Sequence, residues 1–218
     1  MPFELNSFLG EQELEYLSSL RIEKRRSEWL AGRMAIKRLL QAGHAELANR
    51  KLCEIQILKV ENGAPCLLID HDFRLNASIS LSHSNKYVFC AYADEKDLLG
   101  VDLELIANRS VDFIQDFFTV DEIQQLNLYP QVDQPLLANL IWSAKESILK
   151  ALSLGLTVDT RRINIQPGSS IASSPGWNPL GFTTELTKKD LRLYWRRENE
   201  FVLTACVTEQ LPVRFVQM

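Results

Sequence analysis

The sequence predicts an α+β protein made of two pseudo-symmetric halves, each with a helix packed on a small, mostly antiparallel sheet. Three observations predict this fold: an amphipathic helix in each half, short apolar runs after each helix, and a similarity between the halves. We place the halves at residues 1–106 and 107–218. With 218 residues, 46% of them hydrophobic and 24% charged, the chain is long enough to bury a core.

The first half is expected to hold one helix and several short strands. Residues 28–40 have the spacing of an amphipathic helix that ends near Gly43, with basic residues on its exposed side. Strand-like runs follow at about 52–60, 67–69, 77–81, 86–93 and 97–104, with turn signals at Asn62-Gly63 and Ser84-Asn85.

The second half is expected to hold two helices and four strands. A short helix opens at Phe117 to Glu122 and runs to about Leu128, and a longer one runs from about Gln134 to Leu154, where Gly155 stops it. Strands are expected at about 161–165, 180–186, 191–197 and 201–208. The segment from Pro167 to Pro179, rich in Gly, Ser and Pro, is the best loop candidate.

The second half resembles the first in two segments. Superposing the helices pairs Trp29 with Trp142 and Lys37 with Lys150, at an offset of 113 residues (142 − 29). Superposing the strands pairs Tyr87 with Phe201, at an offset of 114 (201 − 87). Either two amphipathic helices and two apolar strands match by chance, or two related halves face each other around a pseudo-twofold axis. A cleft between such halves is a natural ligand site.

The composition indicates where in the cell the protein is expected and where its charge is concentrated. No apolar run reaches the 18 or more residues of a membrane span, and the start of the chain lacks the basic region of a secretory signal, so we expect a cytoplasmic protein with no membrane contact. The four cysteines are widely spaced and imply neither zinc nor disulfides. Net charge is −4, yet Arg21 to Arg38 holds seven basic residues against two acidic ones, a patch that can hold phosphate.

Two acidic motifs carry the functional argument. Asp102 and Glu104 leave the same face of a predicted strand, roughly 7 Å apart at the Cα atoms, so they can share one cation. Glu146 and Lys150 lie one helical turn apart on a polar stripe that begins at Trp142. Three carboxylates together form an oxygen-rich site suited to Mg²⁺, which usually binds substrate phosphates as well. The substrate is therefore expected to carry phosphate.

Four motifs in order resemble those of the Sfp-type 4'-phosphopantetheinyl transferases. They are Ser80-Leu81-Ser82-His83-Ser84, Gly100-Val101-Asp102-Leu103-Glu104, Phe117-Phe118-Thr119-Val120-Asp121-Glu122 and Trp142-Ser143-Ala144-Lys145-Glu146-Ser147-Ile148-Leu149-Lys150. The resemblance implies that the protein transfers the phosphopantetheine arm of coenzyme A to a serine of an apo acyl, aryl or peptidyl carrier protein. It also implies that coenzyme A and Mg²⁺ lie between two α+β halves. Fused halves make a monomer the expected state.

The resemblance also implies roles for particular residues. Asp102, Glu104 and Glu146 would bind Mg²⁺, Lys150 would pair with a phosphate oxygen, and Glu146, directly or through a metal-bound water, would accept the serine proton. The residues expected to contact coenzyme A are Arg21, Arg25, Arg26, Arg33, Pro65, Ser82, His83, Lys145 and Lys150. One departure concerns Gly63-Ala64-Pro65, which lacks the lysine of a Gly-Lys-Pro pattern, so its place in the binding site is in doubt.

Some alternatives stay open. Glu122 belongs either to the site or to a capping box with Thr119. A metal-dependent nuclease also uses clustered carboxylates and a lysine, but Glu104 is followed by Leu105-Ile106 where that class usually has Glu-x-Lys, so we expect no nucleic-acid partner. A catalytically inactive module that binds coenzyme A or a carrier could keep the fold. The sequence does not indicate which carrier is served.

Overall fold

The computed structural model describes residues 4–59, 65–69, 73–74, 77–94, 97–168 and 176–208. The chain forms an α+β fold, as predicted. The helices are α1 (Glu11–Ser19), α2 (Glu23–Gly43), α3 (Val111–Phe117), α4 (Val120–Leu128) and α5 (Gln134–Ala151). The strands are β1 (Ile55–Lys59), β2 (Pro65–Ile69), β3 (Phe73–Arg74), β4 (Ala77–Ser84), β5 (Tyr87–Asp94), β6 (Leu99–Leu105), β7 (Ile163–Gln166), β8 (Asn178–Thr184), β9 (Leu191–Glu198) and β10 (Phe201–Thr208).

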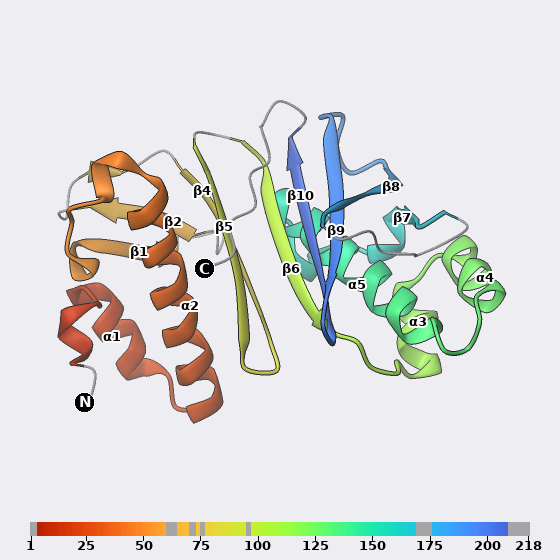
Figure 1. Ribbon diagram of the computed structural model, residues 1–218, viewed down its shortest axis with the longest axis horizontal. Coiled ribbons are helices and arrows are strands. Elements are labelled where there is room, and N and C mark those ends of the chain that lie inside the picture. The colour runs from red at the N-terminus through yellow and green to blue at the C-terminus, as the bar shows by residue number, and fades with distance from the viewer. Residues whose placement is uncertain are drawn as a thin grey trace.

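The strands form three antiparallel sheets. A three-stranded sheet has the order β1-β2-β3, β4 and β5 form a hairpin, and a five-stranded sheet has the order β6-β10-β9-β8-β7. Figure 1 shows the hairpin standing between α2 on one side and β6 on the other, while α5 packs on the five-stranded sheet. Residues 99–105 pair with β10 and so belong to the larger sheet. The boundary at residue 106 stays a prediction.

Most predicted elements are present, but the first half has two helices where we expected one. The helix predicted to end at Gly43 is α2, which begins earlier, at Glu23. Helix α1 was missed although Leu14, Tyr16 and Leu17 lie on one face, because it has only nine residues and one of its two buried positions is the charged Glu13. Helix α3 was missed as well, although Ser110 caps it by accepting a hydrogen bond from the Phe113 N–H.

The β4–β5 hairpin has the tight turn that Ser84-Asn85 indicated. The two turn residues, Asn85 and Lys86, have φ values of 44° and 73°. Positive φ at both positions is typical of the two-residue turn whose twist matches the flanking strands. The equivalent hairpin, β9–β10, turns at Asn199, with φ of 52°.

The two halves repeat each other, but with two offsets. The hairpins β4–β5 and β9–β10 match at 114 residues (191 − 77). The helices α2 and α5 end 108 residues apart (151 − 43), and β1 and β7 also begin 108 apart (163 − 55). The two offsets differ by six residues because the β7–β8 connection, residues 167–177, is six residues longer than the β1–β2 connection, residues 60–64. The predicted strand pairing is therefore correct, and the pairing of Trp29 with Trp142 is wrong by five positions.

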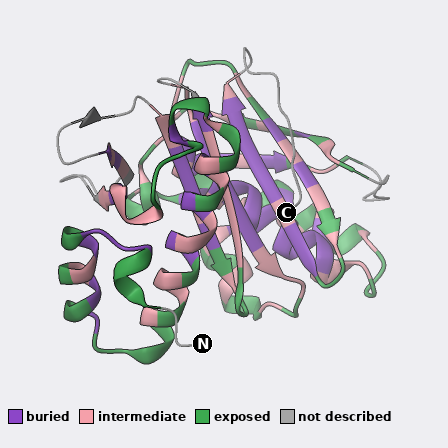
Figure 2. Ribbon diagram, turned by 60° about the vertical axis from the view of Figure 1, so that its left-hand side comes forward, coloured by how far each residue is buried: buried purple, intermediate pink, exposed green. Residues whose placement is uncertain are grey.

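The largest core surrounds α5. Fourteen of its eighteen residues are buried, because the sheet covers one side and α3 and α4 contribute to the other. Figure 2 shows the buried residues running through this helix and along β10, while α1 and α2 keep exposed outer faces. Within the described part of the chain, no helix combines the length and the apolar character that crossing a bilayer requires.

Candidate active site at the junction of β4, β6 and α5

Three serines of β4 connect the hairpin to β6. The N–H groups of Val101 and Leu105 donate to the hydroxyls of Ser80 (2.9 Å) and Ser84 (3.2 Å), and the Ser82 hydroxyl donates to Asp102 Oδ1 (2.7 Å). Alternate residues of a strand share a face, so all three hydroxyls point toward β6. The Ser-Leu-Ser-His-Ser motif is thus the seam between the hairpin and the five-stranded sheet.

Asp102 lies at the centre of this seam and is 3% exposed. Its Oδ1 also accepts a hydrogen bond from Lys150 Nζ, at 2.6 Å, so β4, β6 and α5 meet at one oxygen atom. Its Oδ2 is buried and has no hydrogen-bond partner among the described residues. An unpartnered buried carboxylate oxygen is costly, and it is a feature that a bound ligand would explain.

Gly100 allows α5 to approach β6 closely enough for this contact. A Cβ atom at Gly100 would lie 1.8 Å from the Ser147 carbonyl oxygen and 2.5 Å from the Ala151 nitrogen. Both are backbone atoms of α5, so only glycine fits between the strand and the helix. The close approach places Lys150, one residue before Ala151, within reach of Asp102.

Glu104 is held by two donors. Arg109 Nη2 lies 2.8 Å from its Oε2, and the Trp142 indole N–H donates to its Oε1 at 3.0 Å. Burial raises the pKa of the Glu104 carboxyl and the nearby Asp102 charge raises it further, whereas Arg109 and Trp142 oppose the rise. The carboxylate is therefore oriented by its neighbours.

Glu146 is the third carboxylate of the group. Burial raises its pKa most, the charges of Asp102 and Glu104 add to the rise, and Lys150 opposes it. Among the described residues, no hydrogen bond or ion pair holds the Glu146 carboxylate. Within those same residues, no three His, Cys, Asp or Glu side chains form a cluster that could already hold a metal ion. The structure thus brings the three acids into electrostatic contact without closing them into a metal cage.

His83 comes to the same junction from β4. Its imidazole lies against α2, where a Cβ atom at Gly32 would be 2.6 Å from Nε2. Burial is the main cause that lowers the pKa of His83; Lys150 and Arg33 lower it further, and Glu28 opposes them. His83 therefore lies against α2, close enough to Lys150 of α5 for the lysine charge to affect its pKa.

The arginines predicted to contact coenzyme A, on α2 and just before it, differ in how far their side chains are exposed. Arg33 is 8% exposed, lies 3.5 Å from Glu13 and stacks over the Trp29 ring at 4.7 Å. Arg26 donates to the Leu17 carbonyl at 2.7 Å and so ties α2 to α1. Arg21 and Arg25 are exposed. The side chain of Pro65 and the whole of Gly63 and Ala64 lie outside the described residues, so the prediction about this loop stays a prediction.

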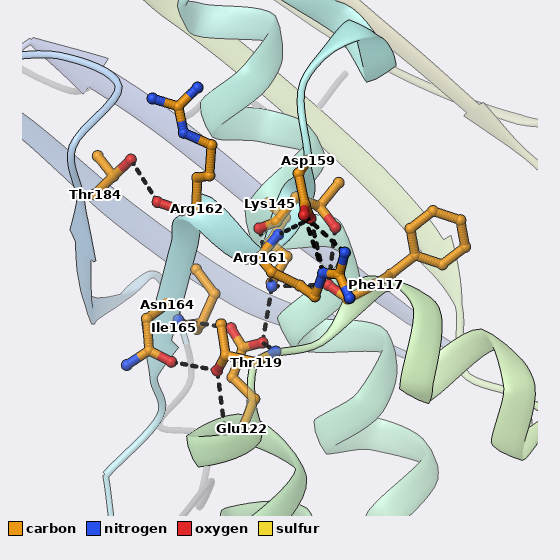
Figure 3. Close-up of polar contacts among 11 residues, drawn as sticks. Phe117, Thr119, Glu122, Lys145, Asp159, Arg161, Arg162, Asn164, Ile165 and Thr184 are labelled. Atoms are coloured by element: carbon orange, nitrogen blue, oxygen red, sulfur yellow. Dashed lines mark hydrogen bonds and ion pairs between the residues drawn. The ribbon is translucent and has the colours of Figure 1, made fainter.

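Lys145 lies in a buried network apart from the acidic group, and its predicted contact with coenzyme A stays a prediction. Its side chain is fully buried, and Figure 3 shows it extending from α5 toward Glu122 of α4. Its ammonium group lies 2.8 Å from Glu122 Oε2 and donates to the carbonyls of Phe117 (2.9 Å) and Thr160 (3.1 Å). These three acceptors use all three ammonium hydrogens, so none is left for a cofactor.

Glu122 belongs to a capping box, the second of the two readings of its motif. The Thr119 hydroxyl accepts from the Glu122 N–H (3.2 Å), and Glu122 Oε2 accepts from the Thr119 N–H (2.7 Å). Its Oε1 accepts from the Ile165 N–H of β7, at 2.7 Å. Figure 3 shows this carboxylate joining α4, α5 and β7.

The first half contains the same network around Lys37 and Glu13. Lys37 pairs with Glu13 and donates to the carbonyls of Phe8 (2.6 Å) and Leu52 (3.0 Å). Glu13 accepts from the N–H groups of Gly10 (3.1 Å) and Ile57 (3.0 Å). Lys37 therefore corresponds to Lys145, at an offset of 108 (145 − 37), and not to Lys150 as the sequence pairing proposed. The repeated network supports the pseudo-symmetry more strongly than the sequence similarity does.

Sequence reasoning missed the residues that support the acidic group. Arg109, which contacts Glu104, lies in the loop after β6, and Asn139, which accepts from Arg109 Nε at 2.8 Å, lies near the start of α5. Ser143 and Thr204 connect α5 to β10 through their hydroxyls, 2.8 Å apart. The only signal in the sequence was that Arg109 follows closely after the acidic strand.

The fold and this site together define a class: two-lobed α+β proteins with carboxylates and cations gathered where the lobes meet. Comparison with known proteins gives the family within that class. Residues 98–206, half of the chain, match the model of the 4'-phosphopantetheinyl transferase superfamily. The chain belongs to this superfamily.

Individual relatives match over part of their length. The chain is 27% identical to the 4'-phosphopantetheinyl transferase gsp of Aneurinibacillus migulanus, over 66% of this chain and 60% of that protein. It is 29% identical to the 4'-phosphopantetheinyl transferase Sfp of Bacillus subtilis, over 48% and 44%. A solved holo-(acyl-carrier-protein) synthase from Bacillus anthracis, in complex with CoA (3',5'-ADP), aligns with 50% of this chain and 93% of its own, with 17% identity and a TM-score of 0.42.

Proposed function

We propose that the protein transfers the 4'-phosphopantetheine arm of coenzyme A to a serine hydroxyl of an apo acyl, aryl or peptidyl carrier protein. Adenosine 3',5'-bisphosphate is released. The observation that carries the proposal is the contact of Asp102 with Lys150, close enough to Glu104 and Glu146 for the Asp102 charge to raise the pKa of both, in a chain of this superfamily. A magnesium requirement, a monomeric state and a cytoplasmic location are parts of the same proposal.

The residues at the junction fit a magnesium ion in their chemistry. Mg²⁺ prefers oxygen ligands and is usually bound through one or two carboxylates plus substrate phosphates. Asp102 Oδ2 is buried without a partner, and the Glu146 carboxylate has no hydrogen bond or ion pair among the described residues. Asp102, Glu104 and Glu146 would hold the ion, which would supply positive charge to the diphosphate.

The protein groups account for the remaining steps. The serine oxygen forms a bond to the phosphorus that carries pantetheine, and the bond from that phosphorus to the bridging oxygen breaks with its electrons going to the departing nucleotide. Glu146 accepts the serine proton, a role for which a carboxyl of raised pKa is suited near neutral pH. Lys150 donates to a phosphate oxygen and offsets the charge that develops there.

The cofactor phosphates are expected to lie between α2 and the junction. His83 and Lys150 face this region, and Arg21 and Arg25 remain exposed on α2 and just before it. Arg26 and Arg33 are held by contacts with α1 and Glu13, so we expect them to shape this surface more than to grip a phosphate.

A mass measurement tests the proposal. Purified protein, coenzyme A, Mg²⁺ and a panel of apo acyl, aryl and peptidyl carrier proteins are incubated together, and intact carrier masses are recorded. We expect one phosphopantetheine per reactive carrier, and none when Mg²⁺ is removed by a chelator. No mass gain on any carrier of the panel would refute the proposal.

A further inference from the structure

A closed ring of side chains surrounds the Glu104 carboxylate. One oxygen meets Arg109 and the other meets the Trp142 indole, so each has a different donor. The ring closes through Phe113, whose aromatic ring lies 4.7 Å from the Arg109 guanidinium carbon and 4.9 Å from the Trp142 ring. Rotation of the carboxylate would break at least one of these contacts.

Arg109 is itself fixed from behind. Its Nε donates to Asn139 Oδ1 at 2.8 Å. Asn139 is fully buried, and its amide nitrogen donates to the carbonyls of Ala107 (2.6 Å) and Pro135 (2.7 Å). The guanidinium therefore spans from the beginning of α5 to the end of β6, with a separate N–H group for each partner.

We propose that Arg109 is a positioning residue that fixes the orientation of Glu104 for binding a divalent cation. The inference rests on the proposed function and concerns the same site. Arg109 does not touch the reacting atoms; it acts through Glu104. Residues that orient metal ligands in this way typically contribute about 10-fold to 100-fold to metal affinity.

The geometry and the charge of Arg109 predict opposite changes in metal affinity when this residue is replaced. A positive charge beside a cation site opposes binding of the cation, so if only its charge mattered, removing Arg109 would tighten metal binding. The planar guanidinium can contact Glu104, Asn139 and Phe113 at once, whereas a lysine ammonium is a point charge that cannot reproduce this arrangement. Substitution by lysine keeps the charge and removes the geometry.

The test measures binding of Mn²⁺ alone, from the electron paramagnetic resonance signal of the free ion, in wild type, Arg109→Lys and Arg109→Gln. We expect both variants to bind Mn²⁺ at least about 10-fold more weakly than wild type. Arg161→Lys is the matched control, because Arg161 is an exposed arginine paired with Asp159 away from the site, and it should bind as wild type. Circular dichroism confirms that each variant is folded.

The outcomes separate this inference from the proposed function. Wild-type affinity in Arg109→Lys, or tighter binding in Arg109→Gln, would overturn the positioning role while leaving carrier modification by the wild type untouched. A wild type that neither binds Mn²⁺ nor modifies any carrier would overturn the proposed function as well. In the carrier assay, the Lys variant should need more Mg²⁺ for half-maximal rate, with a smaller change in the rate at saturating Mg²⁺.

Discussion

Asp102 is the residue at which the separate elements of the site converge. Ser82 and Lys150 both contact its Oδ1, while its Oδ2 has no protein partner among the described residues. The residue is therefore held firmly by one oxygen and left open at the other. This division suits a carboxylate that must keep its place while it binds a ligand.

Asp102→Asn tests this arrangement. The amide oxygen can still accept from Ser82, and Lys150, whose side chain is 28% exposed, can turn toward water, so we expect stability to change by only about 1 kcal/mol. The lost negative charge should reduce the rate of carrier modification by about 10²-fold to 10³-fold. Rates at saturating coenzyme A and urea denaturation measure the two effects. A near-normal rate at saturating Mg²⁺ would show that the Asp102 charge has no part in the reaction.

At the scale of residues, the sequence identified the acids better than their neighbours. Strand and helix periodicities were enough to place Asp102 beside Glu104 and Glu146 beside Lys150. Lys145 was assigned to the cofactor through the family resemblance alone, and no local pattern shows that its ammonium group pairs with the buried Glu122 carboxylate. Arg109 was missed since no periodicity relates a loop residue to the strand before it.

At the scale of elements, two glycines set how closely the helices approach the strands. Gly100 lies against backbone atoms of α5, whereas Gly32 of α2 lies against the His83 side chain, whose Nε2 would be 2.6 Å from an added Cβ atom. The first contact cannot yield without moving α5. The second can yield by turning one imidazole ring.

Gly100→Ala and Gly32→Ala form a matched pair. We expect Gly100→Ala to destabilise the protein by about 1–3 kcal/mol or more, because α5 must move away from β6. Gly32→Ala should leave the melting temperature nearly unchanged and weaken coenzyme A binding by displacing His83. Thermal unfolding and calorimetry distinguish the two. Equal loss of stability in both variants would contradict this account.

The elements with clear amphipathic patterns were predicted well, and the short ones were not. Helix α5 was recognised because apolar residues recur along its whole length. Helices α1 and α3 have only nine and seven residues, so each has too few apolar positions to establish a helical period from the sequence. Their positions depend on tertiary contacts, such as the Glu13 pair with Lys37, that no local pattern reveals.

At the scale of the whole molecule, two equivalent buried networks join the helices of each half to a strand. Lys145 with Glu122 and Lys37 with Glu13 are each fully buried, and each lysine also binds two backbone carbonyls. Removal of one partner from a buried pair leaves an uncompensated charge, which usually costs about 3–5 kcal/mol. The symmetry predicts similar costs in the two halves.

Lys145→Met and Lys37→Met should therefore each lower the free energy of unfolding by about 3–5 kcal/mol in urea denaturation. Adding Glu122→Gln to Lys145→Met should restore part of the loss, because the orphaned charge is gone. Under conditions where it is folded, Lys145→Met should bind coenzyme A as wild type does. Loss of binding with the fold intact would return Lys145 to the site.

The sequence revealed the duplication but not its register. The two hairpins match at a single offset, 114 residues, because their strands and turns have equal lengths. The helices match at an offset of 108, because they precede the β7–β8 connection, which is longer than the β1–β2 connection. Tryptophans at residues 29 and 142 favoured a single offset for the whole chain. Only the contacts of Lys37 and Lys145 distinguish equivalent positions from merely similar ones.

The corrected register makes Arg38 and Ala42 of α2 the equivalents of Glu146 and Lys150 of α5 (146 − 108 and 150 − 108). The two helices therefore repeat each other in their buried lysines but not at these two positions, where α5 has a carboxylate and an ammonium group and α2 has a guanidinium and a methyl group. A molecule that is nearly symmetric in its framework is thus asymmetric in its chemistry, so the equivalent positions of α2 cannot supply a second carboxylate–lysine pair.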